Sequence, residues 1–124
     1  MEWTTEIGCA YTATVTAATA AATCVVSIQL KDYAGNNLTV KNAVNFYISS
    51  DADGDTTATV ASIAIGTGII HTIADTMAYQ LISEDDGSIT LTLTTVGTGA
   101  NDRYLQLVLP NGKVIASNIM EFTS

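Results

Sequence analysis

The feature that most constrains this chain is the alternation of polar and apolar residues along most of its length. In residues 24–32 (CVVSIQLKD) every second side chain is apolar: Cys24, Val26, Ile28 and Leu30. Residues 88–96 (SITLTLTTV) repeat the pattern, with Ile89, Leu91 and Leu93 between threonines. Successive side chains of a β-strand point to opposite faces, so a period of two predicts half-buried strands.

Turn signals separate these runs at Gly35-Asn36-Asn37, Asp86-Gly87 and Asn111-Gly112. The Asn-Gly pair after Pro110 predicts a hairpin with a type I′ turn. Residues 57–76 predict a weaker pair of strands around Gly66 and Gly68. Strand signals recur about every 8 to 12 residues without a convincing helix, which predicts an all-β antiparallel sandwich of about seven to nine strands.

The 124 residues predict one domain. Residues 11–23 (YTATVTAATAAAT) are a low-complexity Ala/Thr stretch with one large aliphatic residue, Val15. We expect residues 1–22 to be an extended N-terminal arm or a first edge strand, and residues 23–124 to be the sandwich. A frayed terminus is the alternative, because termini without anchors are mobile.

Charge is scarce and one-sided: twelve acids and four bases give a net charge of −8. Such a chain repels phosphate backbones and anionic lipid, so we expect neither nucleic acid nor membrane as a partner. The start lacks a basic segment followed by an apolar one, which predicts synthesis in the cytoplasm. Cys9 and Cys24 are then expected to be reduced, with a disulfide as the alternative. Sheet faces rich in Thr and Ala can be covered by other chains at little desolvation cost.

Asp51, Asp53 and Asp55 form the best candidate site, because three carboxylates two residues apart can converge on a hard cation such as Ca²⁺. An EF-hand loop beginning at Asp51 would need Gly and Glu where Thr56 and Ser62 stand. The alternative is a solvated turn in which the aspartates cap backbone amides.

No other group predicts chemistry. Consecutive Glu84, Asp85 and Asp86 point in different directions, and a lone His71 has no nucleophile or second ligand nearby in sequence. We expect His71 to be a partly buried or interface residue, and the protein to have no catalytic residue and no cofactor. Tyr33 and Tyr47 predict either a contact patch or ordinary packing.

Four segments carry a resemblance to known families: SIQLKDYAGNNLTVKNAVNFYIS, SEDDGSITLTLT, YLQLVLPNGKVIASNIMEF and YISSDADGD. The first two resemble bacterial immunoglobulin-like repeats of the invasin and intimin type. The third, together with YISSDADGD, is similar to small immunoglobulin-like virion proteins encoded beside tailed-phage capsid genes. The resemblance covers Thr23 to Phe122.

The resemblance implies an immunoglobulin-like structural module and carries over no catalytic residue. Its phage members imply a virion protein that decorates or cements a capsid or tail, with the major capsid protein, other virion proteins and copies of itself as partners. Its adhesin members imply the alternative, a cell-surface adhesin or carbohydrate-binding module. An adhesin would have a signal or anchor and tandem copies, so we expect the virion function, with an acidic face pointing outward.

Overall fold

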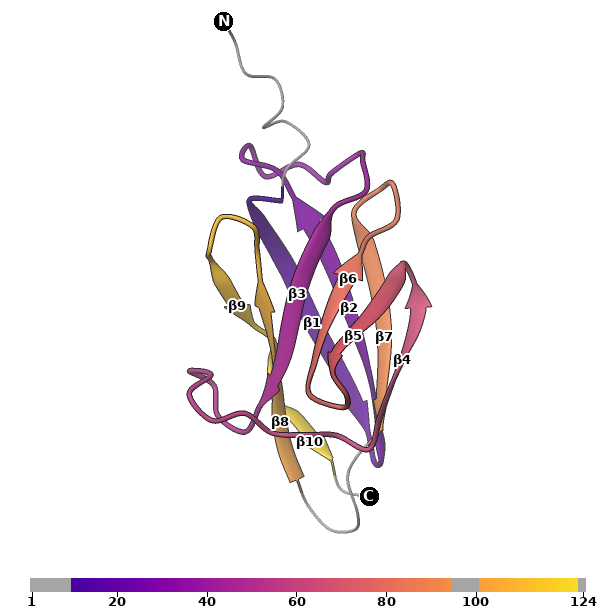
Figure 1. Cartoon of the computed structure of the whole chain (residues 1–124), viewed down its shortest axis with the longest axis vertical. Helices are drawn as coiled ribbons and strands as arrows, with labels where there is room; N and C mark the ends of the chain where they lie inside the picture. The colour runs from indigo at the N-terminus through magenta and orange to yellow at the C-terminus, as the bar shows by residue number, and fades with distance from the viewer. Residues whose placement is uncertain (1–9, 95–100, 123–124) are drawn as a thin grey trace, which may run out of the picture.

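The computed structural model describes residues 10–94 and 101–122, and within these ranges every regular element is a β-strand (Figure 1). In chain order the strands are β1 (Thr12–Ala20), β2 (Thr23–Lys31), β3 (Ala43–Ser49), β4 (Ser62–Thr67), β5 (Ile69–Ala74), β6 (Ala78–Ile82), β7 (Ser88–Thr94), β8 (Asn101–Val108), β9 (Val114–Ala116) and β10 (Met120–Phe122). The described residues thus hold ten strands, above the predicted number. One reason is that the predicted last strand, KVIASNIMEF, is interrupted between β9 and β10. No described segment forms a helix that could cross a membrane.

The strands form two antiparallel sheets, as the alternation predicts. The first sheet has the order β1-β2-β7-β4, and the second has the order β10-β8-β3-β6-β5. Strand β9 pairs with β8 on the edge that β3 leaves open. The N-terminal segment contributes β1, which pairs with β2 along all nine of its residues and is an edge strand. Residues 1–9, the rest of the predicted arm, lie outside the described residues.

The inward side chains of both sheets form one apolar core. The predicted inward residues are confirmed: Cys24, Val26, Ile28, Leu30, Ile89, Leu91 and Leu93 are each at most 2% exposed. They pack with the inward residues of the second sheet, such as Phe46, which stacks on Tyr79 at a centroid distance of 5.4 Å. Burial of each large apolar side chain contributes about 1.5–3 kcal/mol. This shared core holds the two sheets face to face.

The turn at Asn111-Gly112 is not of type I′, contrary to the prediction. The Gly112 N–H donates to Leu109 O at 2.9 Å, and the Leu109 N–H donates to Lys113 O at 2.9 Å. Gly112 has a φ of +88°, whereas Asn111 does not have a positive φ. The loop is therefore a three-residue turn of type I that ends in a left-handed glycine. Pro110 explains the difference: it lacks the N–H that a two-residue hairpin would pair with Lys113, and its φ near −65° suits the first central position of a type I turn.

One lateral side of the molecule is formed by a single segment that changes sheets. The two weak strands predicted around Gly66 and Gly68 are β4 and β5, and they lie in different sheets: β4 pairs with β7, and β5 pairs with β6. Gly68 lies between them with a φ of +100°, and a Cβ there would lie 2.7 Å from the Ile82 carbonyl oxygen. Glycine is thus required where the chain crosses from the first sheet to the second. The outer edges of both sheets on this side are β4 and β5 (Figure 1).

The opposite side is closed by a side-chain bridge. Asn118, between β9 and β10, accepts a hydrogen bond from the Ala17 N–H through Oδ1 at 2.8 Å. Its Nδ2 donates to the Ala17 carbonyl at 2.9 Å. The amide therefore pairs with β1 as a neighbouring strand would, and it joins the edge of the first sheet to the second.

Candidate functional site

The outward side of the first sheet is a regular surface without acidic groups, which we call the Thr face. Its residues are Thr14, Thr16, Ala18, Val25, Ser27, Thr90, Thr92, Thr94, Ser62 and Ala64. They stand in rows across the four strands, such as Ala18, Val25, Thr92 and Ala64. Lys31, at the end of β2, is the one charged residue within these strands. A partner that covers the Thr face would have almost no charge to desolvate.

The acidic residues of the described chain do not form a face, contrary to the expectation. Eight of them lie in loops between strands: Asp32, Asp51, Asp53, Asp55, Asp75, Glu84, Asp85 and Asp86. Asp102 and Glu121 lie opposite each other at one end of the second sheet. The reason is that strand positions are filled by apolar residues inside and by Thr, Ser and Ala outside. Negative charge is therefore concentrated at the ends of the strands.

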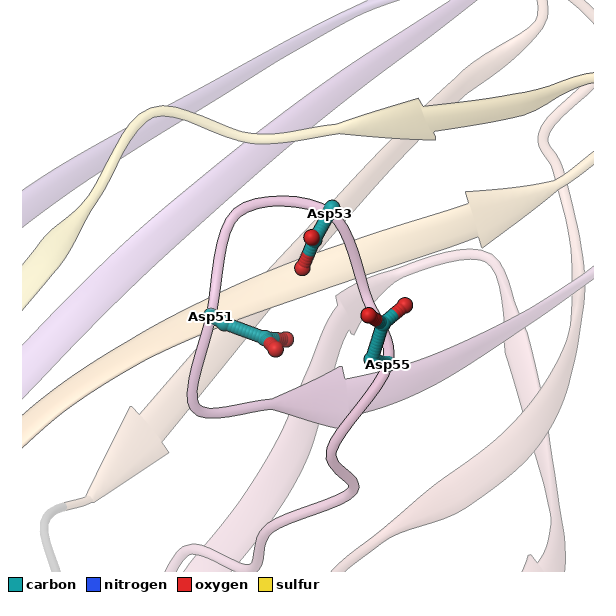
Figure 2. A group of neighbouring side chains, drawn as sticks. All are labelled: Asp51, Asp53 and Asp55. Atoms are coloured by element: carbon teal, nitrogen blue, oxygen red, sulfur yellow. The ribbon is translucent and has the colours of Figure 1, made fainter.

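The loop after β3 brings the three predicted carboxylates together (Figure 2). Oxygen atoms of Asp51, Asp53 and Asp55 lie within 4.8 Å of one another, and Asp53 and Asp55 are exposed. The loop is held from below by Gln106, which is 2% exposed and donates through Nε2 to Ser49 Oγ at 3.1 Å and Ala52 O at 3.2 Å. The Asp51 carboxylate also accepts from the Thr56 N–H at 3.4 Å, the contact that a capped turn would make.

The electrostatics of this loop reflect the crowding of like charges. A hydrogen bond shared with Asp51, and then the negative charges of Asp51 and Asp55, raise the pKa of Asp53. For Asp51, desolvation acts to raise the pKa, but the backbone N–H of Thr56 and the hydrogen bond with Asp53 together lower it. A proton shared by Asp51 and Asp53 relieves the repulsion, and a bound cation would relieve it equally. The geometry is compatible with both predicted alternatives, a cation site and a capped turn.

The other candidate residues do not converge. His71 is exposed on β5, not partly buried, and it belongs to no group of potential metal ligands among the described residues. Glu84 Oε2 accepts the Gly68 N–H at 2.9 Å, and Asp86 Oδ1 accepts the Ser88 hydroxyl at 2.6 Å, so both carboxylates support turns. Cys24 is buried, and desolvation raises the pKa of its thiol. Cys9 lies outside the described residues.

One group of side chains was only partly anticipated. Tyr33 is 80% exposed and contacts Tyr11 edge to face, with ring centroids 5.2 Å apart. Lys113 Nζ lies 4.9 Å from the centre of the Tyr11 ring. The other predicted contact residue, Tyr47, instead donates from its hydroxyl to the Gly54 carbonyl at 3.0 Å and supports the aspartate loop. Tyr11 and Lys113 are far apart in the sequence, so only the fold reveals that they meet.

Comparison with protein-family models and with curated proteins found no match to this chain.

Proposed function

We propose that this protein is a non-enzymatic virion structural protein of a tailed phage, which decorates or cements the capsid or tail surface through its Thr face. The observation that carries the proposal is the placement of charge. Although the chain has a net charge of −8, none of the four strands of the first sheet holds a carboxylate. Such a surface suits contact with another protein, since interface centres are depleted of charged residues. The partner would be the major capsid protein or another virion protein.

The size of the Thr face favours an assembly of many copies. Four strands about 4.8 Å apart and seven residues long cover about 440 Å². A stable two-protein interface buries about 800 Å² on each partner, so one Thr face supplies roughly half. Contacts of this size become strong when many copies bind a symmetric shell, because each contact raises the effective concentration of the next.

The strand order supports an immunoglobulin-like module. The first sheet, β1-β2-β7-β4, has the order of strands A-B-E-D in constant-type immunoglobulin domains. In the second sheet β3 corresponds to strand C and β8 to strand F. Strands β9 and β10, which both pair with β8, together correspond to strand G. Strands β5 and β6 are then a hairpin inserted between D and E, which extends the second sheet beyond C. The resemblance to phage and adhesin modules seen in the sequence is compatible with this order.

The test compares two lysine substitutions at outward positions of central strands. Thr92→Lys places a charge in the middle of the Thr face, and Asn45→Lys places one on the outward side of β3 in the second sheet. We expect Thr92→Lys to abolish co-sedimentation with shells of the phage that encodes the chain, and Asn45→Lys to retain it. Equal binding of both variants would contradict the assignment to the Thr face. Failure of the wild type to bind would contradict the virion function.

A second candidate function, glycan binding by an adhesin-type module, is favoured by Tyr33. An aromatic ring that is 80% exposed on a hydrogen-bonded turn offers a flat apolar surface to a ligand. Asp32 holds this turn, because its Oδ1 accepts the N–H groups of Ala34 and Asn36, both at 3.0 Å. Binding of the isolated protein to cell-surface oligosaccharides that is lost in Tyr33→Ala would support this function over decoration.

A further inference from the structure

Strands β1 and β2 are joined by a two-residue turn that has no glycine. Ala20 pairs with Thr23, so the turn consists of Ala21 and Ala22. Ala21 has a φ of +55°, and Ala22 does not have a positive φ. A two-residue turn with a positive φ at its first position normally holds glycine there, because a residue with a Cβ is strained in that conformation. The turn at Ala21 therefore stores strain in the folded monomer.

The sequence around this turn favours an extended chain. Between Thr12 and Lys31 there is no Gly, Pro, Asn or Asp, which are the strongest turn-forming residues. The turns that contain Gly35, Gly87 and Gly112, in contrast, place glycine at a residue with positive φ. The hairpin of β1 and β2 is thus held together by the contacts of β1 and not by the sequence of its turn.

Strand β1 buries little apolar surface. Its inward side chains are Ala13, Val15, Ala17 and Thr19, of which only Ala17 is buried, with 7% exposed. The inward residues of β2 are each at most 2% exposed. Strand β1 is otherwise held by its backbone ladder with β2 and by the two hydrogen bonds between Ala17 and Asn118. Release of β1 therefore removes one large aliphatic side chain, Val15, from the edge of the core.

We infer that two copies of this chain exchange β1, so that β1 of each copy pairs with β2 of the other. In the exchanged dimer Ala21 and Ala22 form an extended hinge, and the strain at Ala21 is lost in both chains. Exchange of an identical element restores the contacts that it had in the monomer. Short connections under strain favour such an exchange, because the hinge is the part that differs between the two forms.

The partner is a second copy because the site left by β1 is specific for β1. All nine residues of the strand pair with β2 without a break in register. A second copy supplies the same small inward side chains at Ala13 and Ala17, and its Ala17 backbone meets Asn118 as in the monomer. Protein concentration then decides between the closed monomer and the exchanged dimer. The inference rests on β1 and its turn and does not depend on the virion function.

The first test is the solution mass of the full chain after refolding at increasing protein concentration. We expect sedimentation to show a species of twice 12.9 kDa whose fraction rises with concentration. Ala21→Gly relieves the strain in the monomer, so the dissociation constant of the dimer should rise about 5- to 30-fold, since two turns are relieved per dimer. Ala34→Gly is the matched control, because Ala34 is exposed and does not have a positive φ, and it should leave the dissociation constant unchanged. A wild type that stays monomeric, or a dimer that Ala21→Gly does not weaken, would overturn the inference.

The second test identifies the exchanged strand by disulfide trapping in a Cys9→Ser background. Thr19 lies directly opposite Cys24 in the ladder. Opposed Cα atoms are about 4.5–5.5 Å apart, within the range of about 4.4–6.8 Å that a disulfide allows. When the dimer fraction of Thr19→Cys is isolated and oxidised, it should run as a covalent dimer on a denaturing gel without reductant, whereas the monomer fraction should form the disulfide within one chain.

The control for random crosslinking is Val114→Cys in the same background, because Val114 is exposed on β9 and lies outside the exchanged strand. Its dimer fraction should run as a monomer on the same gel. A Thr19→Cys dimer fraction with disulfides within single chains only would refute the exchange of β1. Neither test requires binding to a shell, so failure of the virion function would leave both results unchanged.

Discussion

Replacement of Asn118 by Ala is expected to weaken the closed side of the molecule by a measurable amount. The substitution removes the hydrogen bonds from the Ala17 N–H at 2.8 Å and to the Ala17 carbonyl at 2.9 Å. Each is worth about 0.5–1.5 kcal/mol, so the free energy of unfolding should fall by about 2 kcal/mol. Unfolding entropy is about 2.1 cal/mol/K per residue, or about 0.26 kcal/mol/K for 124 residues, and Tm should therefore fall by about 8 °C.

Thermal and urea unfolding followed by circular dichroism would measure this loss. Asn118→Asp sharpens the test, because it keeps an acceptor for the Ala17 N–H but sets a carboxylate oxygen against the Ala17 carbonyl. It should destabilise at least as much as Asn118→Ala. The control is Asn45→Ala at an exposed position of β3, where we expect a change within about 0.5 kcal/mol. If Asn118→Ala matches this control, the bridge does not hold β1 to the second sheet.

Four further outcomes can be measured. The raised pKa of Asp53 means that its ionised form disfavours the fold, so Asp53→Asn should raise Tm near pH 7. At about pH 3 the Asp53 carboxyl is protonated in both the folded and the unfolded state, and the Tm of the variant should equal that of the wild type. CaCl₂ should leave the wild-type Tm unchanged if the loop is a capped turn, and a Ca²⁺-induced rise that this variant abolishes would establish a cation site. Ala21 has a φ of +55° in the turn between β1 and β2, a conformation that is strained for alanine but not for glycine. Ala21→Gly should therefore stabilise the protein by roughly 0.5–1 kcal/mol in urea unfolding. A loss of stability would show that Ala21 is not strained. Glu121 faces Asp102 across β10 and β8, so Glu121→Lys should add about 0.2–1 kcal/mol, and the gain should shrink in high salt if it is electrostatic.

The strands and their buried faces could be predicted because they depend on local pattern. The alternation in residues 24–32 and 88–96 sets which side chains enter the core, and the structure buries the same residues. The type I′ prediction is wrong at Asn111-Gly112 because an Asn-Gly pair favours that turn only where the residue before it can keep its N–H in the ladder, which Pro110 cannot. The same three-residue geometry recurs at Gly35 and Gly87, whose N–H groups donate to Asp32 and Glu84. Glycine at the last loop position is the signal common to all three turns.

Contacts between distant residues could not be predicted in the same way. Nothing near Gln106 in the sequence indicates that its amide is buried beneath the aspartate loop, because that depends on the pairing of β3 with β8. The bridge from Asn118 to Ala17 spans 101 residues and depends on both sheets. The three aspartates, in contrast, lie within five residues, so the sequence alone was enough to predict that their carboxylates would converge.

The placement of charge and the protection of edges are two parts of one physical requirement. A chain with few charges must stay soluble, and its acids at the strand ends provide long-range repulsion without interrupting the sheet surfaces. At physiological salt the repulsion between charges decays over about 8 Å. Acids at the strand ends therefore act only weakly between sheet surfaces that meet side by side or face to face. Neutral surfaces would then aggregate unless their edges were limited, and here the Asn118 bridge and the short strands β9 and β10 limit one side. Association is thereby directed away from that side, and the Thr face remains as the proposed contact surface.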